Sequence, residues 1–380
     1  MSTYAAAKNE EDGEVEKMKI GVLTFVHTSS FGAVLQAYAL SHYIEECGAE
    51  CELIDYRCEK VDRIHNPKRR LKVKSIRELA ILPFIYPVFR KRMIKFLCFE
   101  KKYMKFSEKT YTRENVDAAA KNYDLIVAGS DQILNRNLTG NDSTYFLDFV
   151  QDPRKKCTYA ASIGTEYFSD SQAKQCEEYL KDFRNLSVRE ERTALRLSEN
   201  LGREVSFDVD PTLLYDGSFW RHFVGERPEK EDYIVIFMVP DNPALFQAIY
   251  RLAEKTQCKL MWIKPGFMGK KKVKLLNTLS PEEFLTYIYH AKYVITGSFH
   301  AVCFSVQFQK NLIAVLPEVK ERVARVVSLL ENVGLMDCLV KDFDEMDGRK
   351  TDYSHVAEKL DVLREKSRRT VQSISGRNSV

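Results

Sequence analysis

Short apolar runs alternate with helical patterns along most of this chain, and this alternation limits the possible folds more than any other feature of the sequence. Residues 19–26 form an apolar run rich in β-branched and aromatic residues, and a loop with one glycine and two serines follows at 27–33. Apolar residues then recur at helical spacing as far as Gly48, and a second apolar run follows at 51–56. A strand, a loop, a helix and a second strand in this order predict a βαβ unit, in which the two strands are parallel.

The alternation is interrupted once and then starts again, which predicts two α/β domains. We expect a disordered tail at residues 1–17, an N-terminal α/β domain at 18–216, a C-terminal α/β domain at 217–345, and a C-terminal helix and tail at 346–380. A basic helical insertion at 60–112 interrupts the first domain. With 380 residues, each domain can bury a core of its own. Ligands of α/β proteins bind at the carboxyl ends of parallel strands, so we expect the site in a cleft between the two sheets.

Composition and targeting signals exclude several classes of protein. Hydrophobic residues make up 44% of the chain and charged residues 29%, which excludes a largely disordered chain. The sequence contains no run of about 18 apolar residues, so we expect no transmembrane helix. Residues 1–17 lack the apolar core of a secretory signal. The nine cysteines include no CxxC pair. We therefore expect a cytoplasmic protein with buried thiols and without a metal site.

Positive charge gathers in the predicted insertion. Between Lys60 and Lys109, sixteen Lys or Arg residues stand against four Asp or Glu residues. Such a segment attracts nucleic acid, anionic lipid or phosphorylated substrates, or it forms a solvated helical face. No nucleic-acid motif accompanies it, so we expect no nucleic acid partner. Because apolar residues interleave with the cations, we predict a peripheral contact of 60–109 with the inner, anionic face of the membrane.

Several short segments that follow predicted strands combine small residues with groups that bind anions. They occur in the order that is typical of polysaccharide pyruvyl transferases, and the chain resembles this family over about residues 18–340. The segments that carry the resemblance read SSFGAVLQAYAL (29–40), GSDQILN (129–135), LSVRE (186–190), DPTLL (210–214) and TGSFHAVCFS (296–305). Together with the two-domain pattern, the resemblance implies two Rossmann-like α/β domains facing a cleft, in a glycosyltransferase-B-like architecture.

The resemblance also implies a reaction. In this family a pyruvyl group passes from phosphoenolpyruvate to a sugar, in the synthesis of a polysaccharide of the cell envelope or capsule. A proton is added to the methylene carbon, a sugar hydroxyl attacks the adjacent carbon, phosphate departs, and a neighbouring hydroxyl closes a cyclic ketal. The implied partners are phosphoenolpyruvate as donor and a saccharide acceptor that is carried on a lipid or a nucleotide. No step requires a cofactor or a metal ion, and we expect neither.

Phosphoenolpyruvate carries a carboxylate close to a phosphate, so its pocket needs cationic donors and backbone N–H groups. Arg189 follows a predicted strand, and its planar guanidinium can bond two oxygens at once. His300 stands at the expected N-terminus of a helix, where an anion is favoured, and it can also donate a proton. Ser298 and Arg325 are further candidate substrate-binding residues. The alternatives are a structural hydrogen bond for His300, a pair with an adjacent glutamate for Arg189, and a solvated charge for Arg325.

A carboxylate near the acceptor hydroxyl would serve as the base, and we predict Asp131 in this role. Gln132 and Asn135 are expected to hold sugar hydroxyls. An aspartate in such a loop also caps the following turn, and this alternative stays open for Asp131. Ser30 and Gly32 are candidate substrate-binding residues in the first loop, although the same residues also describe a tight turn.

Two other functions are consistent with the sequence. A glycosyltransferase that uses a nucleotide sugar would have the same two-domain scaffold. A non-catalytic binding protein is the second, because Gly297 and Ala301 stand near His300 where the family usually has Asp and Gly. Fold alone does not decide among these functions, so the residues of the site must do so.

Overall fold

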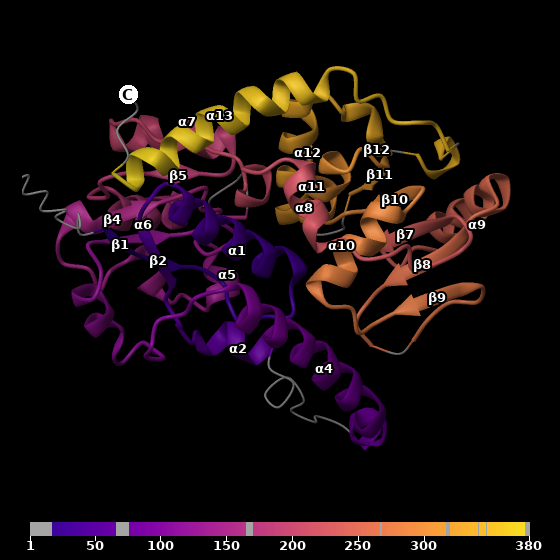
Figure 1. The fold of residues 1–380 in the computed structure, drawn as a ribbon, viewed down its shortest axis with the longest axis horizontal. Helices are drawn as coiled ribbons and strands as arrows, with labels where there is room; N and C mark the ends of the chain where they lie inside the picture. The colour runs from indigo at the N-terminus through magenta and orange to yellow at the C-terminus, as the bar shows by residue number, and fades with distance from the viewer. Residues whose placement is uncertain are drawn as a thin grey trace, which may run out of the picture.

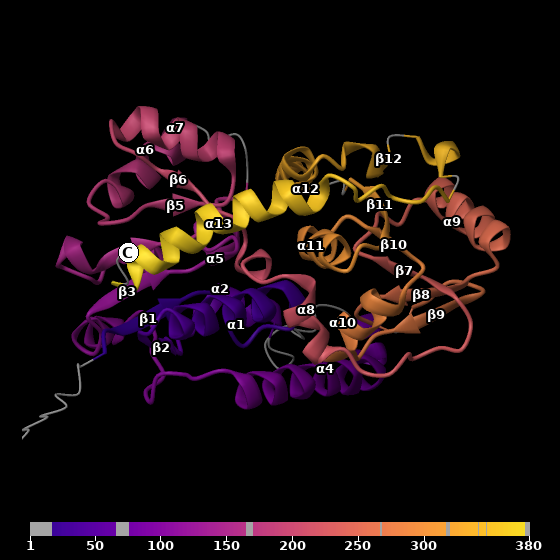
Figure 2. The ribbon, with the colours of Figure 1, turned by 45° about the horizontal axis from the view of Figure 1, so that its top comes forward.

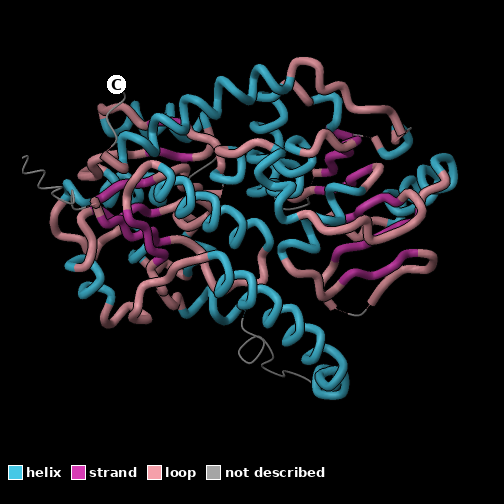
Figure 3. Tube along the Cα trace, in the orientation of Figure 1, coloured by secondary structure: helices cyan, strands magenta, loops and turns pink. Residues whose placement is uncertain are grey.

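The computed structural model of the protein describes residues 17–65, 76–164, 170–266, 268–316, 320–340, 342–346 and 348–376. The predicted disordered tail, except for its last residue, lies outside this part of the chain, as do residues 66–75 of the predicted insertion. The strands gather in two separate groups with helices between and around them (Figure 3). Two larger parallel sheets and one parallel sheet of two strands account for these groups, which confirms the predicted α/β fold class.

The first domain is built on a parallel sheet with the strand order β2-β1-β3-β4. Its strands are β1 (Lys19–Leu23), β2 (Glu50–Leu53), β3 (Leu125–Ala128) and β4 (Lys156–Thr158). A smaller sheet of β5 (Ser187–Val188) and β6 (Ser206–Phe207) is linked to the region of β4 by isolated bridges. β3 and all of β1 after Lys19 are buried, because the inner strands of a parallel sheet are covered on both faces.

The helices of the first domain cover this sheet and reach the second domain. α1 connects β1 to β2, and these strands pair in parallel, so the predicted βαβ unit is confirmed. α1 also contacts helices of the second domain, which explains why nearly all of its residues are buried. The helices are α1 (Phe31–Glu46), α2 (Glu59–His65), α4 (Ile76–Tyr103), α5 (Arg136–Thr139), α6 (Asp170–Leu180) and α7 (Glu191–Leu201).

The second domain is built on a six-stranded parallel sheet with the order β12-β11-β10-β7-β8-β9. The strands are β7 (Tyr233–Phe237), β8 (Lys259–Ile263), β9 (Val273–Leu276), β10 (Tyr293–Thr296), β11 (Asn311–Val315) and β12 (Leu339–Val340). The helices are α8 (Gly217–Trp220), α9 (Pro243–Thr256), α10 (Pro281–His290), α11 (Phe299–Gln307) and α12 (Lys320–Val333). Short 3₁₀ helices span Val116–Lys121, Ser143–Phe146, Pro153–Lys155, Pro211–Leu213, Arg221–Phe223, Met336–Cys338 and Phe343–Glu345.

The last helix, α13 (Val356–Ile374), lies across both domains (Figure 1 and Figure 2). Nε of Arg364 donates a hydrogen bond to the carbonyl oxygen of Leu213 at 2.9 Å, and the hydroxyl of Ser367 accepts one from the Val209 amide at 3.0 Å. These bonds satisfy backbone groups in the segment that leaves the first domain. α13 therefore fixes the connection between the two domains.

The helix α4 of the insertion forms a second bridge. Nζ of Lys95 lies 2.6 Å from a carboxylate oxygen of Glu283 on α10. Beside this ion pair, the ring of Phe31 stacks on Phe284 with centroids 4.3 Å apart, and Phe96 of α4 lies 5.1 Å from Phe31. Aromatic contacts between the domains thus hold α1, α4 and α10 together next to the interdomain cleft.

Candidate active site

A cleft with a volume of about 380 Å³ lies between the two domains. Its walls include Thr28 and Ser29, which follow β1, and Met238 and Gly297, which follow β7 and β10. These segments are at the carboxyl ends of the strands, where α/β proteins bind their ligands. The structure therefore has the two α/β domains facing a cleft that the sequence predicts.

The N-termini of two helices meet in this cleft. Ser30 caps α1 and Ser298 caps α11, and each side-chain oxygen accepts a hydrogen bond from a backbone N–H of the first turn. Gly32 lies so close to His300 that a Cβ atom on Gly32 would overlap the imidazole ring. The first N–H groups of a helix have no partner within the helix and attract anions. Four of the predicted site residues thus surround a position that favours negative charge.

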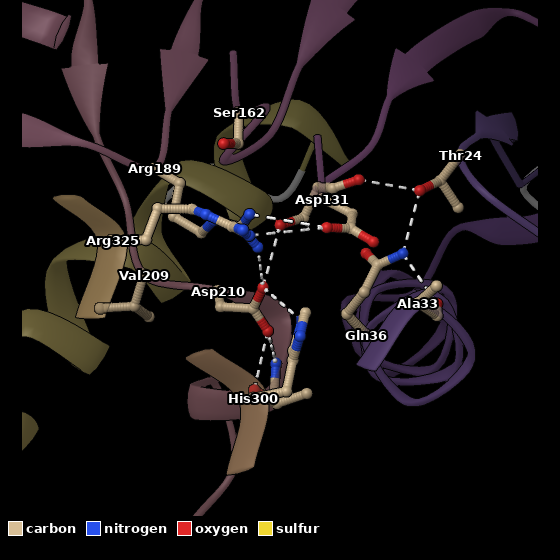
Figure 4. Close-up of polar contacts among 12 residues, drawn as sticks. Thr24, Ala33, Gln36, Asp131, Ser162, Arg189, Val209, Asp210, His300 and Arg325 are labelled. Carbon is tan, nitrogen blue, oxygen red and sulfur yellow. Dashed lines mark hydrogen bonds and ion pairs between the residues drawn. The ribbon is translucent and has the colours of Figure 1, made fainter. Parts of the chain in front are cut away.

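A network of charged side chains lies behind His300. The carboxylate of Asp210 is placed between His300 and Arg189 (Figure 4). Its Oδ2 atom is 3.4 Å from Nε2 of His300 and accepts a hydrogen bond from Nη1 of Arg189 at 2.5 Å. Oδ1 of Asp131 is 3.6 Å from Nη2 of Arg189 and 4.0 Å from Nη1 of Arg325. The structure thus brings the predicted Asp131, Arg189, His300 and Arg325 together around Asp210.

Burial makes this network electrostatically sensitive, since the side chains of Arg189 and Asp210 are 2% and 0% exposed. Burial alone would lower the pKa of Arg189, but the carboxylates of Asp210, Asp131 and Glu190 outweigh it and raise that pKa. Burial likewise opposes ionisation of Asp210, yet His300 and Arg189 hold the pKa of Asp210 well below its usual range. Both groups are therefore charged, and each depends on the other because a buried unpaired charge is costly.

Glu190 is a second buried carboxylate beside the network. The hydroxyl of Ser162 donates to Oε1 of Glu190 at 2.5 Å, and Nε of Arg189 is 4.0 Å from the same oxygen. Burial raises the pKa of Glu190 above its ordinary value, although Arg189 and Ser162 act in the opposite direction. Glu190 is not among the described residues that line the cleft, so it acts on the cleft through its electrostatic interactions with Arg189 and Arg325.

The structure decides the alternative for Arg325 but not the one for Arg189. Arg325 is 8% exposed and lines the cleft, so the alternative of a solvated charge is wrong. Arg189 does contact the adjacent Glu190, but its shorter pair is with Asp210. Arg189 lies behind Asp131 and is not among the described residues that line the cleft. Its role as a direct ligand of the donor stays a prediction.

Of the residues predicted to contact the acceptor, Asp131 and Gln132 line the cleft, whereas Asn135 is not among the described lining residues. Asp131 has a left-handed backbone with φ 73°, and its carboxylate faces the two guanidinium groups. Gln132 lines the cleft beside it. The side chain of Asn135 caps α5 by accepting a hydrogen bond from the Asn137 amide at 3.1 Å, and Asn135 is not among the described cleft-lining residues. A direct contact of Asn135 with a sugar stays a prediction, and the structure gives this side chain a local structural role.

Asp210 and Glu190 both belong to the motifs that carry the family resemblance. The sequence predicts no role for Asp210, and it offers an adjacent glutamate such as Glu190 only as an alternative partner of Arg189. A carboxylate in one motif is a possible partner for an arginine or a histidine in another motif, and this is the signal that could have identified Asp210. The short distances from Asp210 to Arg189 and His300 are visible only in the folded chain. Within the ranges that the structure describes, no three His, Cys, Asp or Glu side chains lie close enough together to hold a metal ion.

The comparisons with known proteins give one family match. A family model described as polysaccharide pyruvyl transferase matches residues 31–318. No curated protein matches the chain.

Three of the solved structures that match the chain contain a bound nucleotide. The UDP complex of MnaA from S. aureus is 12% identical, covers 93% of this chain and 91% of its own, and gives a TM-score of 0.48. A UDP-GlcNAc 2-epimerase from Methanocaldococcus jannaschii, bound to UDP-GlcNAc and UDP, is 11% identical over 94% and 98%, with a TM-score of 0.43. A glycosyltransferase from a Streptomyces species, bound to thymidine diphosphate, is 13% identical over 94% and 99%, with a TM-score of 0.44. Likenesses of this size carry no argument about the ligand of this chain.

Proposed function

Because the chain belongs to the polysaccharide pyruvyl transferase family, we propose that it transfers a pyruvyl group from phosphoenolpyruvate to a saccharide. The product is a cyclic ketal on two neighbouring hydroxyls of a sugar that enters a cell-surface polysaccharide. The family match supports a transferase.

The observation that carries the proposal is the convergence of two helix N-termini, His300 and Arg325 on one small cleft. Among the described residues that line the cleft, Asp131 is the only carboxylate. A ligand with two anionic groups close together meets donors on both walls of such a cleft and little charge of its own sign. Phosphoenolpyruvate is a ligand of this kind.

In the proposed reaction, protonated His300 gives a proton to the methylene carbon of phosphoenolpyruvate, which leaves positive charge on the adjacent carbon. The oxygen of one sugar hydroxyl bonds to that carbon, and its proton passes through Asp131 to the phosphate. The bond from carbon to the phosphate oxygen breaks with its electron pair, and phosphate departs. A neighbouring hydroxyl then closes the ketal, and its proton restores protonated His300. This division of roles gives the reaction both the acid and the base that it requires.

The remaining residues position these groups in the proposal. Arg189 and Asp210 hold His300 and Asp131 in place through the contacts described above. Arg325 binds phosphate beside the N-terminus of α11, where the capping Ser298 leaves N–H groups of the first turn available. Ser30 and Gly32 contribute the backbone of the α1 N-terminus, and Gln132 binds a hydroxyl of the acceptor.

Thermal unfolding with different ligands tests the donor. A ligand at 100 times its dissociation constant stabilises a protein by about 2.7 kcal/mol, which a melting curve detects. Phosphoenolpyruvate is expected to stabilise the wild type more than phosphate or pyruvate does, and His300→Ala is expected to lose this response. Stabilisation by a UDP-sugar but not by phosphoenolpyruvate would replace the proposal with a nucleotide-sugar glycosyltransferase. Binding of phosphoenolpyruvate without turnover on any saccharide would indicate a binding protein.

We also propose that the protein works at the cytoplasmic face of a membrane, where a lipid-linked acceptor would be found. The outer face of α4 mixes exposed apolar and cationic side chains at helical spacing. They are Phe84, Ile94, Leu97, Lys91, Lys101 and Lys102. Each cation close to an anionic lipid surface contributes about 1 kcal/mol. No helix within the described ranges has the length and apolar character needed to cross a bilayer.

Vesicle sedimentation tests this contact. The wild type is expected to sediment with vesicles that contain phosphatidylserine at low salt and to stay in solution with neutral vesicles. The double variant Lys101→Glu/Lys102→Glu should lose binding, because it reverses two charges on the α4 face. The matched control Lys271→Glu/Lys272→Glu reverses two exposed charges in the second domain. Equal binding by the two double variants would show that net charge, and not α4, determines the contact.

A further inference from the structure

The basic insertion places one of its cations inside the cleft. Arg92 of α4 is 5% exposed and lines the cleft, whereas the adjacent Arg90 and Lys91 are exposed. A buried guanidinium loses its hydration, which is costly unless other groups bind it. The position of a buried guanidinium is therefore more informative about its binding partners than the position of a surface cation is. The burial of Arg92 therefore needs an explanation, whereas the exposed cations of α4 do not.

Three contacts fix the orientation of Arg92. Its Nη2 donates a hydrogen bond to the carbonyl oxygen of Ser29 at 2.9 Å. Its Cζ atom lies 4.4 Å from the centre of the Phe31 ring and 5.2 Å from that of Phe96. Ser29 and Phe31 flank the residue that caps α1, so the guanidinium is held beside this helix N-terminus. A side chain that is already held in place loses little conformational entropy when a ligand binds.

The opposite wall of the cleft carries His300 and Arg325 from the second domain. The carboxylate of Asp131 lies between the walls, and it already contacts Arg189 at 3.6 Å and Arg325 at 4.0 Å. Each wall thus presents a guanidinium group and a helix N-terminus. This arrangement fits a small ligand that has an anionic group at each end.

Building on the proposed function, we propose that Arg92 binds the carboxylate of phosphoenolpyruvate, while His300 and Arg325 bind its phosphate. A planar guanidinium matches the two oxygens of a carboxylate. Arg92 lies on the wall of the first domain, opposite His300 and Arg325. The phosphate carries more charge and meets the α11 N-terminus, His300 and Arg325 together. The insertion therefore completes the donor site and is not only an outer surface of the protein.

Calorimetric titration of phosphoenolpyruvate and of inorganic phosphate tests this assignment. Arg92→Gln removes a charge-assisted pair and is expected to weaken phosphoenolpyruvate binding about tenfold to hundredfold. The affinity for inorganic phosphate should not change, because the phosphate is bound at the other wall. Arg92→Lys keeps the charge without the planar fork, so its affinity for phosphoenolpyruvate should fall between those of the wild type and Arg92→Gln. Arg90→Gln makes the same change at an exposed position two residues away and should bind like the wild type.

Unchanged affinity for phosphoenolpyruvate in a folded Arg92→Gln variant would overturn the inference, and so would an equal loss of affinity for inorganic phosphate. If Arg92→Gln does not fold, Arg92→Lys decides the question, because it keeps the alkyl chain and the charge between the aromatic rings. A wild type that does not bind phosphoenolpyruvate at all would instead refute the proposed function.

Discussion

Replacing Gly32 with alanine tests the contact between the two helix N-termini. Gly32 is the second residue of α1 and has an ordinary helical backbone. Alanine is favoured over glycine in a helix by about 1 kcal/mol, so the substitution would stabilise most helices. Here the added methyl group would overlap Nδ1, Cγ and Cε1 of His300. His300 is 9% exposed and lies against Asp210, so its ring has little room to move away.

Overlap of this kind decides the sign of the effect. Forcing an extra methyl group into a packed site costs about 1–3 kcal/mol. After the gain in helix preference, we expect Gly32→Ala to be destabilised by up to about 2 kcal/mol. The displaced His300 also loses its contact with a bound anion, which corresponds to about tenfold to hundredfold weaker binding of phosphoenolpyruvate.

Urea unfolding and calorimetric titration of the same samples measure both effects. Gly225→Ala is the matched control, since a Cβ atom there would meet Thr286 Oγ1 at an ordinary 3.7 Å. The control is expected to unfold and to bind phosphoenolpyruvate like the wild type. A Gly32→Ala protein that is more stable than the wild type and binds phosphoenolpyruvate equally well would refute the close packing of His300 on α1.

Two further predictions concern buried charges. Asp210→Asn leaves the guanidinium of Arg189 buried without its shortest partner, so we expect a loss of about 3–5 kcal/mol in the free energy of unfolding; a loss below about 1 kcal/mol, typical of an exposed pair, would contradict the network. Burial alone would lower the pKa of His27, but its hydrogen bonds to Asp55 and Glu100 raise it from 6.5 to about 9. The raised pKa means that protonated His27 stabilises the folded protein. This contribution to the free energy of unfolding is complete below the unfolded pKa of 6.5 and is lost as pH rises through about 9. The stability difference between wild type and His27→Gln should therefore shrink from pH 6 to about pH 10. A difference that stays constant over this range would show that His27 acts only through packing.

Local signals in the sequence predicted the elements that position the site. The apolar run before His27 and the glycine after the next helical pattern identified the first βαβ unit, because these features act within a few residues. Ser280 followed by Pro281 is a local signal for a helix start, and in the structure Ser280 forms a capping box with Glu283 at the start of α10. The position of His300 near a helix N-terminus followed in the same way from a strand and a helical pattern.

Interactions across the chain could not be predicted from such signals. Asp210 is 21 residues from Arg189, and only the folded chain brings it against His300. Arg92 is one of many cations in a segment whose charge suggests a surface, and its burial depends on how α4 packs against α1. Asn135 shows the opposite case, in which a local cap explains a residue that its motif had linked to the acceptor.

The most direct test of the proposed function is to follow the pyruvyl group itself. Phosphoenolpyruvate labelled with carbon-13 at the carbon that bears the phosphate would be incubated with the protein and with cell-envelope saccharides. Nuclear magnetic resonance would then follow the labelled carbon. We expect the label to appear as a ketal carbon on a saccharide, together with inorganic phosphate, and to remain in phosphoenolpyruvate with His300→Ala. Label that stays in phosphoenolpyruvate while the wild type consumes a nucleotide sugar would contradict pyruvyl transfer.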